Sequence, residues 1–406
     1  MNKLISFVGI AAILGIAYLL STNRKAISLR VVGWGLGMQA ALAVFVLKTP
    51  IGRMIFEKLG AGVTKLLDFS KVGAGFIFGD LVNKMDTFGF IFAFQVLPAI
   101  VFVGSLMGVA YYLGIMQFIV SMVAKLMVKT MGTSGAESLS AVGTVFVGQS
   151  EAPLLIKPYV PEMTKSELMA VMTGGMATIA GSVMAGYLGM LGSEWAPHLL
   201  AASIMGAPAG LVMAKIIVPE TEEPKTKGGA KLEIEKTESS IIEAAAKGAG
   251  DGMHLAFIVG AMLLAFISLI AMINAGLGLF HTSMETVLGY LFMPLAFLMG
   301  VPWHEASTVG SLIGQKIVLN EFVAYSSLSS IIKGQTAGVA LSPHATLIAT
   351  FALCGFANFS SIAINIGCLG GIAPSRRGEL AQLGLRAMVG GALASCLTAT
   401  VAGLLS

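Results

Sequence analysis

The chain has 406 residues, of which 56% are hydrophobic and only 11% are charged. A soluble domain usually carries about a quarter charged residues, so this composition leaves too little polar surface for a water-soluble globule and indicates an integral membrane protein. The net charge of +4 is too small to supply the basic surface that a nucleic-acid-binding protein needs.

Apolar runs of membrane-spanning length recur along the chain and predict an all-α polytopic membrane protein with about eight transmembrane helices. These runs lie near residues 4–20, 31–48, 89–114, 166–191, 196–218, 253–276, 343–370 and 382–405. Residues 51–70 and 116–130 instead mix apolar with charged side chains. We expect these two segments to form amphipathic helices at the membrane interface or across other helices.

Basic residues beside the first and last spans predict the orientation of the chain. Three of them follow the first span and three precede or open the last, whereas only Lys3 precedes the first span. The positive-inside rule places these flanks in the cytoplasm. We therefore expect a multi-pass protein of the cell's inner (cytoplasmic) membrane, with both termini outside the cytoplasm and no cleaved signal peptide.

Residues 134–160 and 287–330 carry Gly, Pro and carboxylates at what would be membrane depth. Lipid-facing helices tolerate such residues poorly, whereas re-entrant hairpins that are buried in protein tolerate them well. Residues 219–240 are the strongly hydrophilic part of the chain, and their Pro, Gly and mixed charges predict a solvated linker with no other function.

These features divide the chain into an N-terminal scaffold and two repeats. Residues 1–88 contain the first spans and the interfacial helix. Residues 89–218 form the first repeat, with a broken helix at 166–191, and residues 241–406 form the second, with a broken helix at 343–370 and the last span. Motifs of Gly and Glu recur in the same order in both repeats, and such an internal inverted repeat is typical of secondary transporters.

Three polar side chains, Gln149, Ser150 and Glu151, precede the helix-breaking Pro153 in the first predicted hairpin. A carboxylate inside a membrane is costly and normally lines a cavity or pairs with a cation. The structural alternative is that Glu151 caps a helix or forms an ion pair within the hairpin, for example with Lys157, but the clustering of three polar side chains favours a binding site.

Asn320 and Glu321 interrupt an otherwise apolar helix in the second half. A buried carboxylate can accept two hydroxyl hydrogen bonds at once, which suits a vicinal diol such as ribose. A structural pair with Lys316 is the alternative, although a separation of five residues is poor spacing on a helix. Asn358 is a further polar residue that is difficult to attribute to helix packing.

The hydroxyls of Thr173, Thr178 and Ser182 lie among glycines in residues 166–191. Hydroxyls and freed backbone carbonyls are ligands that suit a hard monovalent cation such as sodium. Packing of Gly and Thr between helices is the more common explanation of this pattern when it is taken alone.

Three long motifs, GQSEAPLL at 148–155, NEFVAYSSL at 320–328 and CGFANFSSIAI at 354–364, resemble the concentrative nucleoside transporter family, and most closely its sodium-coupled bacterial members. The resemblance covers nearly the whole chain. It implies a homotrimer, two re-entrant hairpins per subunit, and a transport domain that moves across the membrane against a scaffold. The implied activity is sodium–nucleoside symport, with a substrate such as uridine, and not an enzymatic reaction.

The resemblance also implies the binding residues, and it implies no cofactor other than sodium as the coupling ion. The nucleoside-binding residues would be Gly148, Gln149, Ser150, Glu151, Val183, Glu321, Phe356, Asn358 and Ser361. Sodium would lie near Thr144, Val147, Thr178 and Ile179. Sodium-coupled relatives can have Asn at the position of Thr144 and Ser at that of Thr178, and both residues of this chain retain an oxygen ligand.

Three alternative functions stay open at this point. Proton coupling would use Glu151 and Glu321 as proton carriers. An intramembrane serine protease is a distant alternative, because residues 132–135 read G-T-S-G and would offer Ser134 as the nucleophile, which also needs a nearby His. A passive channel would require polar faces along several helices instead of two confined clusters.

Overall fold

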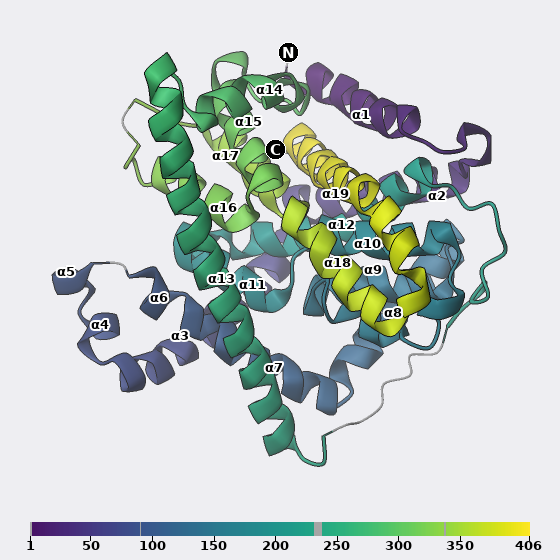
Figure 1. The fold of residues 1–406 in the computed structure, drawn as a ribbon, viewed down its shortest axis with the longest axis horizontal. Coiled ribbons are helices and arrows are strands. Elements are labelled where there is room, and N and C mark those ends of the chain that lie inside the picture. Colours follow the sequence, from purple (N-terminus) through teal and green to yellow (C-terminus); the bar gives the residue numbers. More distant parts are fainter. Residues whose placement is uncertain (1, 90, 231–237, 337) are drawn as a thin grey trace.

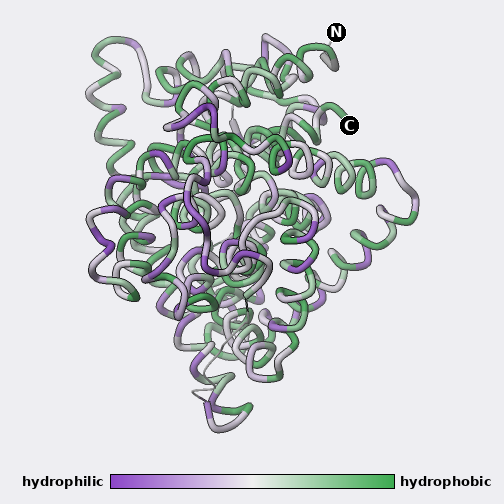
Figure 2. Tube along the Cα trace, turned by 90° about the vertical axis from the view of Figure 1, so that its right-hand side faces the viewer, coloured by the Kyte–Doolittle hydropathy of each residue, from purple (hydrophilic) through white to green (hydrophobic). Residues whose placement is uncertain are grey.

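The computed structural model describes residues 2–89, 91–230, 238–336 and 338–406. Within these ranges the chain is helical and contains no strand (Figure 1), which confirms the predicted all-α class. Hydrophobic residues are spread over the outer helices as well as the interior (Figure 2), and large apolar side chains such as Phe76, Leu264 and Phe280 are exposed. An outer surface of this kind suits lipid.

In the described part of the chain, five helical segments are long and apolar enough to cross a membrane. They are α2 (Leu29–Lys48), α6 with α7 (Phe92–Gln95 and Leu97–Tyr112), η4 with α12 (Ser193–Trp195 and Ala196–Ile217), α13 with η5 (Ile241–Leu277 and Gly278–Phe280) and η6 with α19 (Pro374–Arg376 and Arg377–Leu405). A sixth candidate consists of α14 (Met284–Leu298) and α15 (Trp303–Val318), which bend by 116° where they join. The predicted span near residues 4–20 is the shorter helix α1 (Asn2–Leu19).

Helix α13 is longer than hydropathy predicts. The expected span begins at residue 253, but the helix begins at Ile241, directly after Ser240, whose hydroxyl accepts a hydrogen bond of 3.1 Å from the backbone N–H of Glu243. The additional turns read IIEAAAKGAGDG, and their alanines favour helix without being apolar enough to register as a membrane span.

Both runs that the sequence marks as broken helices consist of two helices each. They are α10 and α11 (Lys165–Ala177 and Gly181–Leu191), and α17 and α18 (Pro343–Leu353 and Phe359–Ile372). None of these halves approaches the length of about twenty residues that a span requires. The breaks therefore place non-helical backbone inside the molecule.

Each half of the chain contains one further interruption, at which the chain turns. Helix α9 (Gly135–Val147) is followed by η2 (Ala152–Ile156), which folds back against it. The closeness is visible at Gly143, where an added Cβ would lie 2.5 Å from Cδ1 of Leu155. In the second half, α15 ends at Val318 and α16 (Glu321–Ile332) begins after two residues.

The second turn is narrower than the predicted hairpin at 287–330. Helix α14, which occupies the first part of that range, is a separate helix packed along α15. Their backbones are so close that a Cβ on Gly310 would lie 2.7 Å from the carbonyl oxygen of Gly289. The sequence pattern could not separate α14 from α15 because both contain apolar residues together with Gly or Pro.

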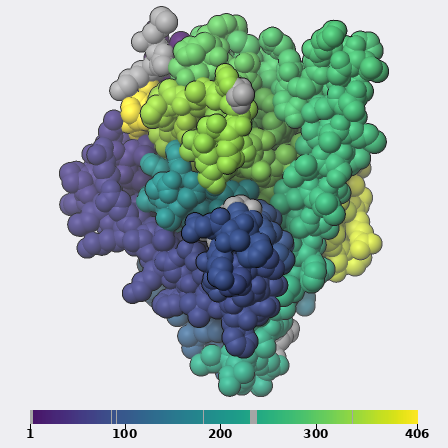
Figure 3. All heavy atoms as spheres, turned by 90° about the vertical axis from the view of Figure 1, so that its left-hand side faces the viewer, coloured from purple at the N-terminus to yellow at the C-terminus, as the bar shows by residue number. Residues whose placement is uncertain are grey.

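The predicted amphipathic segments are α3 (Pro50–Phe78) and α8 (Ile115–Met131). Helix α3 leads into the short helices α4 (Asp80–Asn83) and α5 (Met85–Phe88), which lie at the left edge of Figure 1. Figure 3 shows this blue region next to the green column of α13. Short helical turns η1 (Arg24–Ala26) and η3 (Val160–Glu162) complete the described elements.

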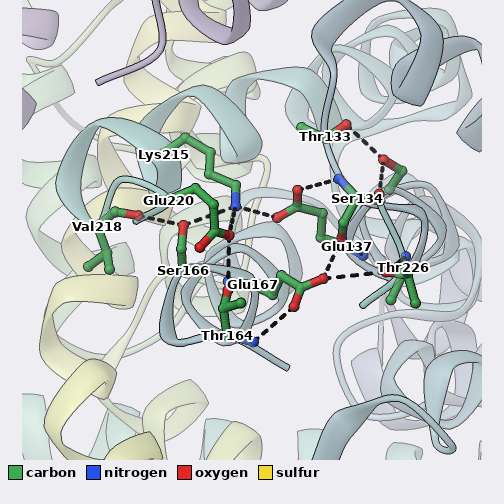
Figure 4. A network of polar contacts seen from close by, with 12 residues as sticks. Thr133, Ser134, Glu137, Thr164, Ser166, Glu167, Lys215, Val218, Glu220 and Thr226 are labelled. Carbon is green, nitrogen blue, oxygen red and sulfur yellow. Dashed lines mark hydrogen bonds and ion pairs between the residues drawn. The ribbon is translucent and has the colours of Figure 1, made fainter. Parts of the chain in front are cut away.

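A buried ionic network joins the starts of α9 and α10 to the end of α12 (Figure 4). Nζ of Lys215 lies 2.7 Å from the carboxylate of Glu137 and 3.1 Å from that of Glu220, and it donates to Oγ of Ser166 at 2.9 Å. Lys215 is 5% exposed and Glu137 1%. Charges so deeply buried require partners, and this network supplies them.

Part of the hydrophilic segment 219–240 belongs to this network. The carbonyl and hydroxyl oxygens of Thr226 accept hydrogen bonds from the backbone N–H groups of Gly135 and Ala136, at 2.9 and 3.1 Å. These groups in the first turn of α9 have no helical partner of their own. The interpretation of 219–240 as a linker with no other role is therefore wrong for its first part, while residues 231–237 lie outside the described residues.

We predict that Lys215→Met destabilises the protein by about 3–5 kcal/mol, because the carboxylate of Glu137 would stay buried without its cation. The measurement is the melting temperature of the detergent-purified protein. The control is Lys227→Met, which removes an exposed ion pair with Glu223 and should leave the melting temperature unchanged. Equal melting temperatures for the two variants would show that the contact of Lys215 with Glu137 does not stabilise the protein.

Candidate functional site

The four helix interruptions meet at one cavity of about 110 Å³. Its polar lining comes from residues 147–151, after α9, and from residues at the starts of α16 and α18. Ala180 and Val183 line it from the break between α10 and α11. An apolar wall faces these groups from α13, formed by Leu255, Ile258, Val259, Met262 and Leu263.

Two of the helices that reach the cavity are capped by asparagine. Oδ1 of Asn320 accepts a hydrogen bond of 3.0 Å from the backbone N–H of Val323, and Oδ1 of Asn358 accepts one of 2.9 Å from that of Ser361. Asparagine is among the preferred N-cap residues. Because a helix N-terminus carries partial positive charge, the starts of α16 and α18 favour acceptor atoms or anions at the cavity.

Glu321, the first residue of α16, is held by Asn358. Nδ2 of Asn358 donates to Oε2 of Glu321 at 2.9 Å, and the two side chains are only 4% and 2% exposed. The oxygen of Asn358 accepts the hydrogen bond that caps α18. The atom that faces Glu321 is therefore the amide nitrogen, which donates to the carboxylate. This contact fixes the carboxylate at the edge of the cavity.

Lys316 does not pair with Glu321. Its ammonium donates to the backbone carbonyl of Ala352 at 2.8 Å, and among the described residues no ion pair joins it to Glu321 or joins Lys157 to Glu151. The ion-pair alternatives for both acids are thus wrong. Glu151 and Glu321 instead line the same cavity.

A second group of polar side chains connects the turn after α9 with α18. Nε2 of Gln149 donates to Oγ of Ser361 at 2.9 Å, and Nδ2 of Asn365 donates to Oε1 of Gln149 at 2.9 Å. Asn365 is not among the site residues predicted from the sequence. The available signal was its spacing, because a residue four positions after Ser361 lies on the same helix face.

Gly148 brings the end of α9 against the break between α10 and α11. Its φ is +92°, a region that glycine adopts readily and other residues rarely do. An added Cβ would lie 2.9 Å from Cβ of Ala180. The glycine therefore permits both the turn and the contact.

This contact brings the four residues of the expected sodium site into one region. Thr144 and Val147 belong to the last turn of α9, and Thr178 and Ile179 lie at the break. Oγ1 of Thr178 donates to the carbonyl of Gly174 at 3.1 Å, so its lone pairs can still bind a cation. Hydroxyl and carbonyl oxygens are the ligands that hard cations prefer.

Of the two remaining hydroxyl residues of that segment, Thr173 lies against α19. A Cβ on Gly390 of α19 would lie 3.1 Å from Cγ2 of Thr173, so Thr173 packs between helices, as the alternative explanation expects. The side chain of Ser182 lies outside the part of the chain that the structure describes.

Ser134 is a helix cap. Its hydroxyl accepts a hydrogen bond from the backbone N–H of Glu137 and donates to the carboxylate of Glu167 at 2.5 Å. The side chain of Glu137 in turn accepts from the backbone N–H of Ser134, which completes a capping box. This arrangement gives the G-T-S-G motif a structural explanation in place of a nucleophile.

All nine residues expected to bind nucleoside line this cavity. So do several that the expectation did not include, chiefly the apolar wall of α13 together with Asn320, Phe322, Ser360 and Ile364. The α13 wall carries no polar residue that could have marked it in the sequence. Its position depends on how α13 packs across the molecule.

Comparison with known proteins gives consistent matches over most of the chain. Residues 8–81 and 198–403 match the N-terminal and C-terminal parts of the family described as Na⁺ dependent nucleoside transporter, and residues 93–194 match a domain described as nucleoside recognition. The chain is 48% identical to a Bacillus subtilis protein described as uncharacterized transporter YutK, over the full length of both.

Two further matches carry functional descriptions. The whole chain is 42% identical to the sodium/nucleoside cotransporter 1 of Rattus norvegicus and covers 64% of that protein. A solved structure of CNTnw in an inward-facing, substrate-bound state matches with a TM-score of 0.95 and 46% identity, covering 100% of this chain and 99% of that one.

We predict that Gly148→Ala destabilises the protein by about 1–3 kcal/mol, the usual cost of a strained backbone conformation. The loss is measured as a lower melting temperature in detergent. A matched control is Gly37→Ala on the exposed side of α2, where an added Cβ meets nothing within 4 Å and where alanine favours the helix. If both variants melt like the wild type, the turn does not depend on the glycine.

Proposed function

The chain belongs to the Na⁺ dependent nucleoside transporter family, as its resemblance to concentrative nucleoside transporters implied, and from this premise we propose that it imports nucleosides such as uridine by symport with sodium. Its relatives are transporters and not enzymes. The observation that carries the proposal is the cavity itself. Glu151 and Glu321, from opposite halves of the sequence, line it together within an apolar protein.

In this proposal the ribose binds beside Glu321. The carboxylate accepts hydrogen bonds from two adjacent hydroxyls, which a fixed carboxylate geometry favours. Asn358 and the N-terminus of α16 hold this acceptor in place before the substrate arrives, which lowers the entropic cost of binding. Ser361 and Phe356 complete the ribose end of the site.

The base binds toward the turn after α9. Gln149, Ser150 and Glu151 supply hydrogen-bonding groups for its edge, with Gly148 at the tip of the turn. Val183 and the apolar side chains of α13 contact its faces. A nucleobase has a polar edge and apolar faces. The cavity likewise has polar side chains on the interrupted helices and apolar side chains on α13.

Sodium binds where the last turn of α9 meets the break between α10 and α11. Thr144, Val147, Thr178 and Ile179 supply its oxygen ligands. Coupling requires that sodium stabilise the form of the turn that binds nucleoside, because an ion shifts an equilibrium only through its differential affinity. Sodium bound beside Gly148 would order the turn that carries Gln149 and Glu151.

Transport then occurs by an elevator-like movement of the cavity-bearing helices against α13 and its partner α7. Backbone contact holds α7 and α13 together, since a Cβ on Gly104 would lie 2.6 Å from the carbonyl of Gly248. We propose a homotrimer in the inner membrane with both termini outside the cytoplasm. In support of the last point, both ends of the chain lie at the same end of the molecule (Figure 1).

We predict that Glu321→Gln lowers sodium-driven uptake of tritiated uridine into proteoliposomes by at least about a hundredfold, because the neutral amide is a weaker acceptor for the diol. Glu223→Gln, in the exposed segment after α12, serves as the control and should transport normally. Uptake near that of the wild type in the Glu321→Gln protein would contradict the ribose assignment.

A sodium gradient should drive uptake, and replacing sodium with choline at constant pH should abolish it. Thr178→Val, which keeps the side-chain shape and removes one oxygen, should raise the sodium concentration for half-maximal uptake about 10–100-fold. Thr173→Val is the matched control. Uptake that persists in choline would rule out sodium and favour proton coupling through Glu151 or Glu321.

A further inference from the structure

Asn365 is a buried residue that touches the cavity only through other side chains. It lies in α18, is 1% exposed, and is not among the cavity-lining residues. Its Nδ2 donates two hydrogen bonds of 2.9 Å, one to Oε1 of Gln149 and one to the backbone carbonyl of Ser361. Both residues that receive these bonds line the cavity.

The backbone carbonyl fixes the direction of every hydrogen bond in this group. A carbonyl oxygen can only accept, so the atom of Asn365 that faces it must be the amide nitrogen. That nitrogen has two protons, and the second points to Gln149, whose facing atom must therefore be its oxygen. The amide of Gln149 consequently has only one orientation compatible with Asn365.

The orientation of Gln149 decides what the cavity offers to a ligand. With Oε1 occupied by Asn365, Gln149 has its Nε2 protons left, and one of them is donated to Oγ of Ser361. Ser361 accepts that bond, which leaves the second Nε2 proton of Gln149. Gln149 therefore presents a donor at this end of the cavity.

We propose that Asn365 is a positioning residue that fixes the amide orientation of Gln149, so that the site binds the exocyclic carbonyl of a nucleobase through the Nε2 donor of Gln149. This inference rests on the proposed nucleoside transport. It names the preferred substrate class as nucleosides with a carbonyl, and not an amino group, at the exocyclic position that faces Gln149. A site with fixed donors discriminates against the amino group because two donors are left facing each other.

The test is Asn365→Asp, which preserves size and shape, removes the donor to the backbone carbonyl of Ser361 and offers Gln149 an acceptor oxygen. The amide of Gln149 must then turn its nitrogen toward α18 and its oxygen toward the cavity. Two nucleoside pairs that differ only by carbonyl against amino report this reversal: uridine with cytidine, and inosine with adenosine. Their KM and kcat are measured for the wild type and the variant in proteoliposomes with an inward sodium gradient.

The expected result is a shift of the KM ratio by about tenfold or more toward the amino member of at least one pair, with kcat changed less than KM. Asn365→Ala, which frees the amide to adopt either orientation, should bring the ratio close to one. A loss of equal size for both members of each pair would overturn the proposal, because a merely structural residue acts on all substrates alike.

Wild-type transport separates this proposal from the one on which it rests. If the wild type transports none of the four nucleosides, both proposals fail. If it transports them and the ratios are unchanged in both variants, only the role of Asn365 is refuted. Should the variants not fold, the wild type decides, because equal KM values within both pairs would show that the exocyclic group is not read.

Discussion

A helix that stops inside an apolar molecule leaves backbone N–H or carbonyl groups that must find partners, because neither water nor lipid can supply them there. The arrangement of this protein follows from that constraint. It stops helices at four places around one cavity, and at two of them, the starts of α16 and α18, the asparagines that cap the helix also line the cavity. Asn358 caps α18 with its oxygen and holds Glu321 with its nitrogen.

The two ends of α9 are built differently. At its start, Glu137, Lys215 and Thr226 form a network in which buried charges and free amides find partners within the protein. At its far end, Gly148 makes a turn against Ala180, and the polar groups that follow it line the cavity. An anchored start and a polar tip allow the turn to respond to an ion or a substrate without displacing the whole helix.

The cavity is also divided in its chemistry, and this division suits a nucleoside. Charged and amide groups lie on the interrupted helices, whereas α13 presents only apolar side chains. A continuous apolar helix makes no directional contact with a substrate, which suits the movement of the interrupted helices along α13 that we propose. In the proposal for Asn365, the donor and acceptor positions on the polar side decide which base edge fits.

The sequence by itself determined the all-α membrane class and the nine residues expected to bind nucleoside, because intramembrane polar residues and long motifs are local signals. All nine line one cavity. Only the tertiary structure revealed the hydrogen bonds of Asn365, the α13 wall and the contacts of Thr226. It also decided that Lys316 bonds to a backbone carbonyl and that Ser134 is a cap. The hydrogen bond between Gln149 and Asn365 joins residues 216 positions apart, and no local pattern can specify a partner at that distance.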